Sequence, residues 1–301
     1  MSEYVVEMRN IVKTFGEVQA VKNGEFTLKK GEIHSLIGEN GAGKSTMMKL
    51  LYGMYPIDSG EIIVKGEKMT ALDPKIAINH GIGMVHQEFM LVNELTVLEN
   101  IILGFEPTKG FTIDFDKARK EVQQYIDEYD MEVQLDKKIS QISVGEAQRV
   151  EIIKTLMRGA DVIILDEPTA GLDPGERIRF RNLISRLAKG RIILLATHIV
   201  SDVEYIAKEI LLLRRGTLVM QGTPQELEQS IQGKVWEVSV NEADMALMVD
   251  TYCVSNIKQQ DGSYLLRIVD DGKPLRGAKP VSPNLDDLFL HTFFQPSEGQ
   301  T

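Results

Sequence analysis

A nine-residue glycine-rich stretch constrains this chain more than any other feature of its sequence. It fits the pattern G-x-x-x-x-G-K-[ST] and adds a second Thr; its residues are Gly38, Glu39, Asn40, Gly41, Ala42, Gly43, Lys44, Ser45 and Thr46. A strand-like run at 32–37 precedes it, and a helix-like run at 47–52 follows. Strand, glycine loop and helix in this order are the context in which the pattern indicates a phosphate-binding loop.

The residue types in this stretch suit a phosphate ligand. Gly41 and Gly43 allow backbone torsions that a side chain would forbid. The curled N–H groups and the positive start of the helix can then point at an anion. Lys44 is expected to reach the β- and γ-phosphates of a nucleotide, and the Ser45 hydroxyl to bind Mg²⁺. The alternative is a glycine-rich turn before an ordinary helix.

Composition limits the class of protein. Apolar residues make up 43% of the chain and charged residues 26%, as in a soluble globular protein. The net charge of −10 argues against a general nucleic-acid binder, which needs a basic surface.

Cys253 is the only cysteine, so we expect no intrachain disulfide and a reducing cytoplasm. The N-terminus lacks the pattern of a signal peptide, and no apolar run reaches the ~18 residues of a spanning helix.

Strand and helix patterns alternate along most of the chain. Strands are expected at 4–9, 25–28, 32–37, 61–66, 81–87, 161–166 and 191–196, with a hairpin formed by 209–213 and 217–220. The runs at 161–166 and 191–196 are nearly all apolar, which is typical of a parallel sheet covered on both faces. Residues 95–158 instead have a helical pattern, with one helix capped by Asp114 or Asp116. The sequence predicts an α/β fold with a parallel-sheet core, an N-terminal antiparallel β part and an inserted helical subdomain at about 95–158.

The pattern changes after the helix that Thr223 and Pro224 begin. The expected elements are strands at 234–240 and 263–269, a helix at 242–250, a loop at 270–282 and a last helix capped by Ser282 and Pro283. We therefore predict a main domain at 1–232 and a small C-terminal α+β accessory domain at 233–301.

Two adjacent carboxylates follow an apolar strand. Asp166 and Glu167 come directly after the run at 162–165. The carboxyl ends of strands are where open α/β sheets bind ligands. We expect Asp166 to hold the Mg²⁺ shell and Glu167 to polarise the attacking water. The alternative is a buried strand that ends in a solvated acidic turn. The phosphate-loop pattern elsewhere in the chain argues against this alternative.

A third pattern, at residues 142–149, places a Ser and a Gly at a helix start. Alone it is a weak signal, because such turns often only cap helices. In order with the other patterns, it makes residues 4 to about 230 resemble the ATP-binding subunit of an ABC transporter, which has a P-loop NTPase core. The family signature reads LSGGQ; Ser143 and Gly145 keep it, whereas Ile142, Val144 and Glu146 depart from it.

The resemblance implies ATP and Mg²⁺ as cofactors and roles for further residues. Phe15 would stack on adenine, Gln87 would contact Mg²⁺ and report to the membrane partner, and His198 would contact the γ-phosphate. Phe15 as a core aromatic, and Gln87 and His198 as strand end caps, are the simpler alternatives. The residues that would meet the ATP of a second subunit are Ser143, Gly145, Glu146 and, in the D-loop, Asp173.

By resemblance, the chain is expected to be an ATP-hydrolysing subunit that is peripheral to the cytoplasmic face of the membrane. It would pair head to tail with a second ATPase subunit, identical or different, and drive a separate membrane permease. Alternatives are a non-transport ABC ATPase, a P-loop kinase, or a nucleotide-binding regulator with little turnover. No nucleic-acid partner is expected.

The two halves resemble different subfamilies. Up to about residue 170, patterns such as that at 81–88 resemble those of ATPases of sugar and nucleoside uptake. In those proteins a second ATPase half usually follows the first. No second half is expected here. From Gly171 on, the stretches 197–204 and 282–290 resemble ATPases of drug and antibiotic efflux. This predicts a hybrid chain, with a single diverged lineage as the alternative, and leaves the direction of transport open.

Overall fold

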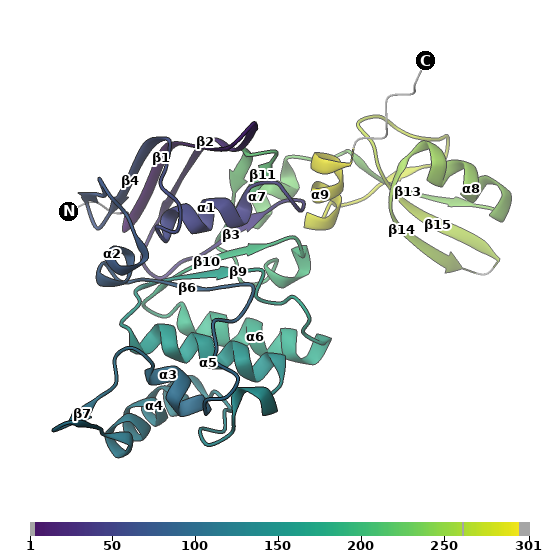
Figure 1. Ribbon diagram of the computed structural model, residues 1–301. Helices are drawn as coiled ribbons and strands as arrows, with labels where there is room; N and C mark the ends of the chain where they lie inside the picture. The colour runs from purple at the N-terminus through teal and green to yellow at the C-terminus, as the bar shows by residue number, and fades with distance from the viewer. Residues whose placement is uncertain (1–3, 261, 295–301) are drawn as a thin grey trace.

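The structure is a computed structural model that describes residues 4–260 and 262–294. Residues 1–3, on which part of the signal-peptide argument rests, and 295–301 lie outside the described residues. The predicted α/β class with a parallel-sheet core is confirmed (Figure 1). A six-stranded sheet has the order β12-β11-β3-β10-β9-β6, and all of its pairs are parallel except β11 with β12. Its strands are β3 (Ile33–Ile37), β6 (Ile82–Val85), β9 (Val162–Asp166), β10 (Ile192–Thr197), β11 (Glu209–Arg214) and β12 (Thr217–Gly222).

The central strands are buried on both faces, as their apolar sequences predicted. In β9, Ile163 and Leu165 belong to the hydrophobic core on one face, while Val162 and Ile164 belong to the core on the other. Successive side chains of a strand point to opposite faces, so a strand covered on both faces is apolar at most of its positions. One face packs on α5 and α6 and the other on α1 (Figure 1). These helices are α1 (Lys44–Leu51), α5 (Val144–Met157) and α6 (Pro174–Leu187).

A second, antiparallel sheet forms the N-terminal part and has the order β2-β1-β4-β5. Its strands are β1 (Val6–Phe15), β2 (Val18–Leu28), β4 (Ser59–Val64) and β5 (Glu67–Lys68), and the short helix α2 (Pro74–Asn79) follows. The strands β1 and β2 are longer than predicted, because they continue to a tight turn at Gly16, which has φ of 57°. Their outer halves are largely exposed, so the apolar pattern that marks a strand is weak there.

The block expected to be helical contains α3 (Val97–Ile102), α4 (Phe115–Tyr129), a 3-10 turn (Ile139–Gln141) and α5. Asp114 is the residue that caps α4, since its carboxylate accepts a hydrogen bond from Lys117 N at 3.0 Å. The small hairpin of β7 (Thr108–Lys109) and β8 (Thr112–Ile113) was not predicted. Its strands have two residues each, too few for a recognisable alternation.

The C-terminal sheet has the order β14-β15-β13-β16, and α8 packs on it. Its elements are β13 (Val235–Val240), α8 (Glu242–Thr251), β14 (Cys253–Gln260), β15 (Ser263–Val269) and β16 (Lys279–Pro280). β14 was missed because its second half is polar and exposed, and β16 lies within the stretch predicted to be a loop.

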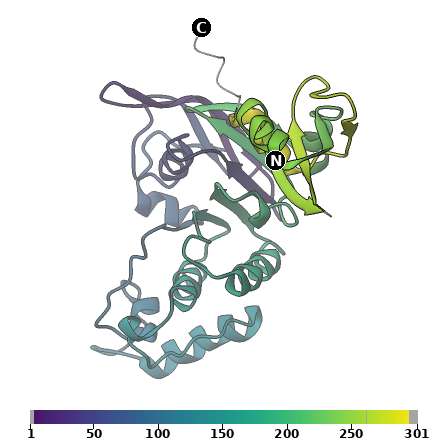
Figure 2. The ribbon, with the colours of Figure 1, turned by 90° about the vertical axis from the view of Figure 1, so that its right-hand side faces the viewer.

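Two other helices connect this sheet to the main domain. They are α7 (Pro224–Gln229) and α9 (Leu285–Phe293). The prediction that Ser282 and Pro283 cap the last helix is wrong: Asn284 caps α9, because its side chain accepts a hydrogen bond from Asp287 N at 2.9 Å. Helix α9 lies between the C-terminal sheet and the main domain in Figure 1, and Figure 2 turns the C-terminal sheet toward the viewer. The boundary at residue 233 stays a prediction.

Helix α9 is held on two sides. Leu285 and Leu288 belong to the same hydrophobic core as α5 and α6. On its other side, Asp287 is fully buried and accepts hydrogen bonds from Arg267 Nε at 3.1 Å and Ser255 Oγ at 2.9 Å. Among residues 4–260 and 262–294, no helix is long and apolar enough to cross a membrane.

Replacing Asp287 with Ala should destabilise the C-terminal sheet, because it leaves the partly buried Arg267 guanidinium with only the longer contact to Glu237, at 3.4 Å, as an acidic partner. We expect a loss of about 3 kcal/mol in the free energy of unfolding. Trp236 is the only tryptophan and lies in β13, so its fluorescence in urea reports on this sheet. The exposed neighbour Asp286 is the control, and Asp286→Ala should change stability by less than about 0.5 kcal/mol. Equal effects of the two substitutions would contradict this role of Asp287.

Candidate nucleotide site

The glycine-rich loop runs from the end of β3 to the start of α1. Gly41 and Gly43 have φ of 81° and 103°, in the left-handed region that glycine adopts without strain. A Cβ on Gly43 would lie 2.4 Å from the carbonyl oxygen of Ala20, and one on Gly38 would lie 2.3 Å from that of Leu213. The loop therefore needs glycine both for its torsions and for its close packing. Its shape leaves the first N–H groups of α1 without partners inside the helix.

Lys44, the first residue of α1, folds back over this loop. Its ammonium group donates hydrogen bonds to the carbonyl oxygens of Gly38 at 2.8 Å and Glu39 at 3.1 Å. It also lies 3.2 Å from Glu167 Oε1. The side chain is 5% exposed, so its positive charge is held in place and little screened by water.

Ser45 and Asp166 form a second pair at the same end of the sheet. The Ser45 hydroxyl donates a hydrogen bond to Asp166 Oδ1 at 2.8 Å. Burial raises the pKa of Asp166, and the bond from Ser45 opposes this rise. The Ser45 hydroxyl and the Asp166 carboxylate lie side by side, and Gln87 lines the same cavity as Ser45. Oxygen atoms of these kinds are the ligands that Mg²⁺ prefers. These residues therefore fit the predicted cation.

Glu167 follows β9 and has φ of 47°, an unusual value for a residue with a side chain. Its N–H donates to the carbonyl oxygen of Ala196 at 2.9 Å. Its Oε2 lies 2.8 Å from Nδ1 of His198, which follows the neighbouring strand β10. Because β9 and β10 are parallel, their carboxyl ends meet at one edge and place these two side chains together.

These groups surround one cavity of about 800 Å³. The predicted residues among its lining are Asn40, Gly41, Ala42, Gly43, Lys44, Ser45, Thr46, Gln87, Glu167 and His198. Lys22 and Arg215 also line it, and sequence reasoning missed both. The turn at Gly216 reaches the loop through a hydrogen bond from its N–H to the carbonyl oxygen of Ala42, at 2.8 Å. The sequence signal for this contact was the pair of adjacent arginines in the hairpin turn. The sequence analysis interpreted that pair only as part of a turn.

Apart from the signature residues and Asp173, four predicted residues do not line the cavity; one is the buried Asp166, which accepts a hydrogen bond from the lining residue Ser45. Phe15 is 42% exposed and packs edge-on against Tyr55, with ring centroids 5.1 Å apart. Its ring is accessible to a ligand, and its stacking on adenine stays a prediction. Gly38 and Glu39 begin the loop, and their carbonyl oxygens accept hydrogen bonds from Lys44.

The signature residues and Asp173 lie at two other helix starts. Ser143 caps α5: its Oγ accepts from Glu146 N at 3.2 Å, while Glu146 Oε2 accepts from Ser143 N at 2.9 Å. The hydrogen bond from Ser143 lowers the pKa of Glu146. Asp173 caps α6 and accepts from Glu176 N at 2.9 Å. Within one chain, these helix starts and the cavity form separate surfaces.

Comparison with known proteins identifies this arrangement. Residues 21–170 match the family model described as ABC transporter. The chain contains an ATP-binding cassette of the ABC transporter family. Members of this family are ATPases. A dimeric ATP-binding cassette, MJ0796, solved in a post-hydrolysis state with ADP and Pi, has 27% sequence identity to this cassette and a TM-score of 0.64. That match covers 72% of this chain and 98% of the solved chain.

Two curated relatives of this cassette have names that refer to import. The nucleoside import ATP-binding protein NupA of Lactococcus lactis subsp. cremoris is 42% identical over 277 residues, 88% of this chain and 54% of its own length. The guanosine import ATP-binding protein NupO of Bacillus subtilis is 48% identical, over 74% of this chain and 45% of its own length. The chain thus spans about half the length of these relatives.

The predicted change of subfamily at Gly171 is not supported. The match with the Lactococcus protein covers 88% of this chain, so it continues well past that residue into the efflux-like half. A single lineage related to import cassettes explains both halves, and the expectation of a hybrid is dropped.

Proposed function

We propose that this cassette hydrolyses ATP and drives solute import through a separate membrane permease, at the cytoplasmic face of the membrane. The observation that carries the proposal is the position of Glu167, between Lys44 and His198 in the cavity of the phosphate loop. The import names of the relatives support the direction of transport. The transported solute is not named by any feature of the site.

Each residue has a defined task in this proposal. The loop N–H groups and Lys44 bind the phosphates, and Ser45, Asp166 and Gln87 hold Mg²⁺, which neutralises phosphate charge. Phosphate also gives Lys44 a new partner, which releases Glu167 from the ion pair at 3.2 Å and leaves its carboxylate free to accept a proton from water. His198 orients that carboxylate. Phosphoryl transfer depends mostly on such positioning and charge neutralisation.

We further propose that a second cassette completes the site. The helix starts at Ser143 and Asp173 have the N–H groups and positive helix ends that bind anions, but they do not line the cavity of their own chain. A head-to-tail partner, either another copy or a different cassette, would place them over the ATP of this chain. The dimeric form of the solved cassette supports this pairing.

A nucleotide-binding regulator with little turnover is the second candidate. Glu146 favours it, because its carboxylate occupies the start of α5, where it repels a phosphate. Purified protein should release phosphate from ATP when Mg²⁺ is present, and EDTA should remove this activity because the Ser45 and Asp166 site is then empty. Turnover no higher than that of Lys44→Ala would support the regulator instead.

A further inference from the structure

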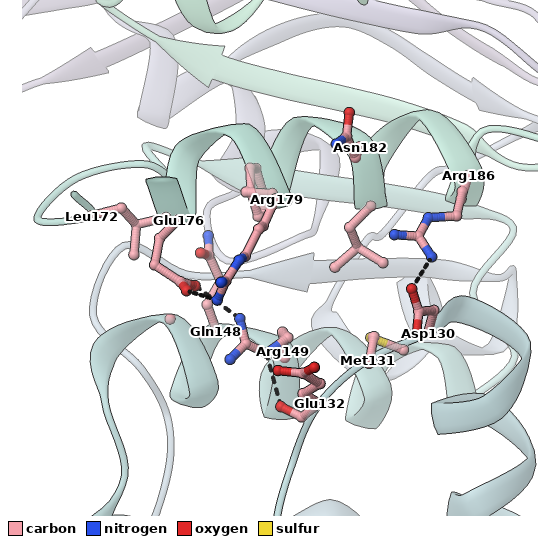
Figure 3. Close-up of a pocket in the computed structure, with 13 residues that line it drawn as sticks. Asp130, Met131, Glu132, Gln148, Arg149, Leu172, Glu176, Arg179, Asn182 and Arg186 are labelled. Carbon is pink, nitrogen blue, oxygen red and sulfur yellow. Dashed lines mark hydrogen bonds and ion pairs between the residues drawn. The ribbon is translucent and has the colours of Figure 1, made fainter. Parts of the chain in front are cut away.

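A second pocket, of about 220 Å³, lies between the signature helix α5, the helix α6 and the end of α4 (Figure 3). Its floor includes the apolar side chains of Met131, Leu172 and Leu183. Charged side chains from α5 and α6 meet over this floor (Figure 3). The pocket lies next to both helix starts that the second cassette would contact, since Gly145 and Glu176 line it.

Glu176 makes contacts with both helices. Its Oε2 accepts a hydrogen bond from Arg149 Nη1 on α5 at 2.9 Å, and its Oε1 accepts one from Arg179 Nη1 on α6 at 2.8 Å. Its backbone N–H donates to Asp173, the cap of α6. The side chains of Glu176 and Arg149 are 21% and 16% exposed, whereas that of Arg179 is 70% exposed. The pair between the helices is therefore better shielded from water than the pair within α6.

Gly145 leaves the space for this carboxylate. A Cβ built on Gly145 would lie 2.5 Å from Oε2 of Glu176, closer than two such atoms can approach. Gly145 is buried under the glutamate, one residue before Glu146 of the capping box. The signature glycine thus has a packing role within its own chain.

We propose that Glu176 is a positioning residue that fixes the signature turn (143–146) and the Asp173 turn in one arrangement for the second cassette. The role rests on the proposed function. The helix α5 belongs to the helical block and α6 follows the catalytic strand β9, so the contact of Glu176 with Arg149 joins the two parts. Without this contact, the signature turn and the Asp173 turn would vary in their relative position. A partner cassette would then have to order the two turns when it binds.

The test uses a Glu167→Gln background, in which ATP is not consumed. Adding Glu176→Gln keeps the size of the side chain but removes its charge. We expect ATP-induced dimerisation to require about tenfold more protein, the scale expected for weakening a partly shielded charge pair. The affinity of the monomer for ATP, measured with a fluorescent analogue, should stay within about twofold, since Glu176 does not line the phosphate cavity.

Two arginines provide a matched pair of controls. Arg149→Gln should reproduce the defect, because Arg149 is the partner across the helices. Arg179→Gln should leave dimerisation unchanged, because Arg179 contacts the same carboxylate from the same helix. Gly145→Ala also displaces the end of the Glu176 side chain without changing a charge. Because Gly145 lies in the turn that would meet the second cassette's ATP, only unchanged dimerisation of this variant bears on the role of Glu176.

The outcomes separate this role from a general loss of stability. A lower unfolding temperature together with weaker ATP binding by the monomer would make Glu176 merely structural and overturn the proposal. Unchanged dimerisation of Glu176→Gln and Gly145→Ala, with the Glu167→Gln parent dimerising, would overturn it while leaving the proposed function intact. A parent that binds ATP but never dimerises would contradict the proposed pairing and this role with it.

Discussion

Glu167→Gln should lower ATP turnover by about three orders of magnitude and leave ATP binding intact. A positioned general base contributes on the order of 10² to 10⁴ in rate, and a Gln amide cannot accept the proton of the attacking water. The substitution keeps the volume of the side chain and removes the carboxylate that competes for Lys44 at 3.2 Å. Binding of ATP should therefore be as tight as in the unmodified chain or tighter. Phosphate release and the binding of a fluorescent ATP analogue measure the two effects.

Glu17→Gln is the matched control for this substitution. Glu17 is exposed and lines the same cavity, so its replacement removes the same charge without touching the cluster around Glu167. It should retain turnover within about threefold, because an exposed charge is well screened. Turnover in Glu167→Gln equal to that in Glu17→Gln would show that Glu167 is not the base.

Lys44→Ala should weaken ATP binding by about 100-fold. The ammonium group is buried and held by Gly38 and Glu39 at the centre of the loop, so its contacts with phosphate would be charge-assisted and poorly screened. Its loss also leaves Glu167, which is only 10% exposed, with His198 as its remaining side-chain partner near the site of the phosphates. An uncompensated carboxylate there repels the ligand. Titration with the fluorescent analogue measures the change.

Lys30→Ala is the control for this loss of charge. Lys30 is exposed and does not line the cavity. Its replacement should leave the affinity for ATP unchanged within about twofold. If both variants bind ATP equally well, the glycine-rich loop is not the phosphate site.

The centre of the site could be predicted because its signals are local. The glycine-rich loop needs only nine consecutive residues, and Glu167 directly follows an apolar run, whereas His198 was named only through the resemblance to a family. Parallel strands bring their carboxyl ends together whatever the rest of the chain does. The fold class follows from the same alternation of strands and helices.

Residues that reach the site through distant contacts could not be predicted. Arg215 lines the cavity only because the turn at Gly216 binds the loop at Ala42, more than 170 residues earlier in the chain. The contact of Phe15 with Tyr55 also joins residues that are distant in the sequence, and the predicted stacking of Phe15 on adenine stays a prediction. Neither contact leaves a periodic pattern in the sequence.

The efflux-like ending illustrates how a local structural pattern can be mistaken for a functional one. In the stretch 282–290, Asn284 and Asp287 form a capping box, and Leu285 and Leu288 pack into the core. Any chain that docks a short helix against a sheet needs such a cap and such an apolar face. The pattern therefore indicates how α9 is held and says nothing about the direction of transport.

The central claim is that a second cassette completes the ATP site, and a second copy of this chain is the partner that the purified protein can test. The mass in solution of the Glu167→Gln variant, measured with and without Mg²⁺ and ATP, tests it most directly. The chain has a mass of 33.8 kDa, and we predict that this monomer becomes a particle of twice that mass only when ATP and Mg²⁺ are present. A particle that binds ATP and keeps the mass of the monomer at every protein concentration would contradict the claim.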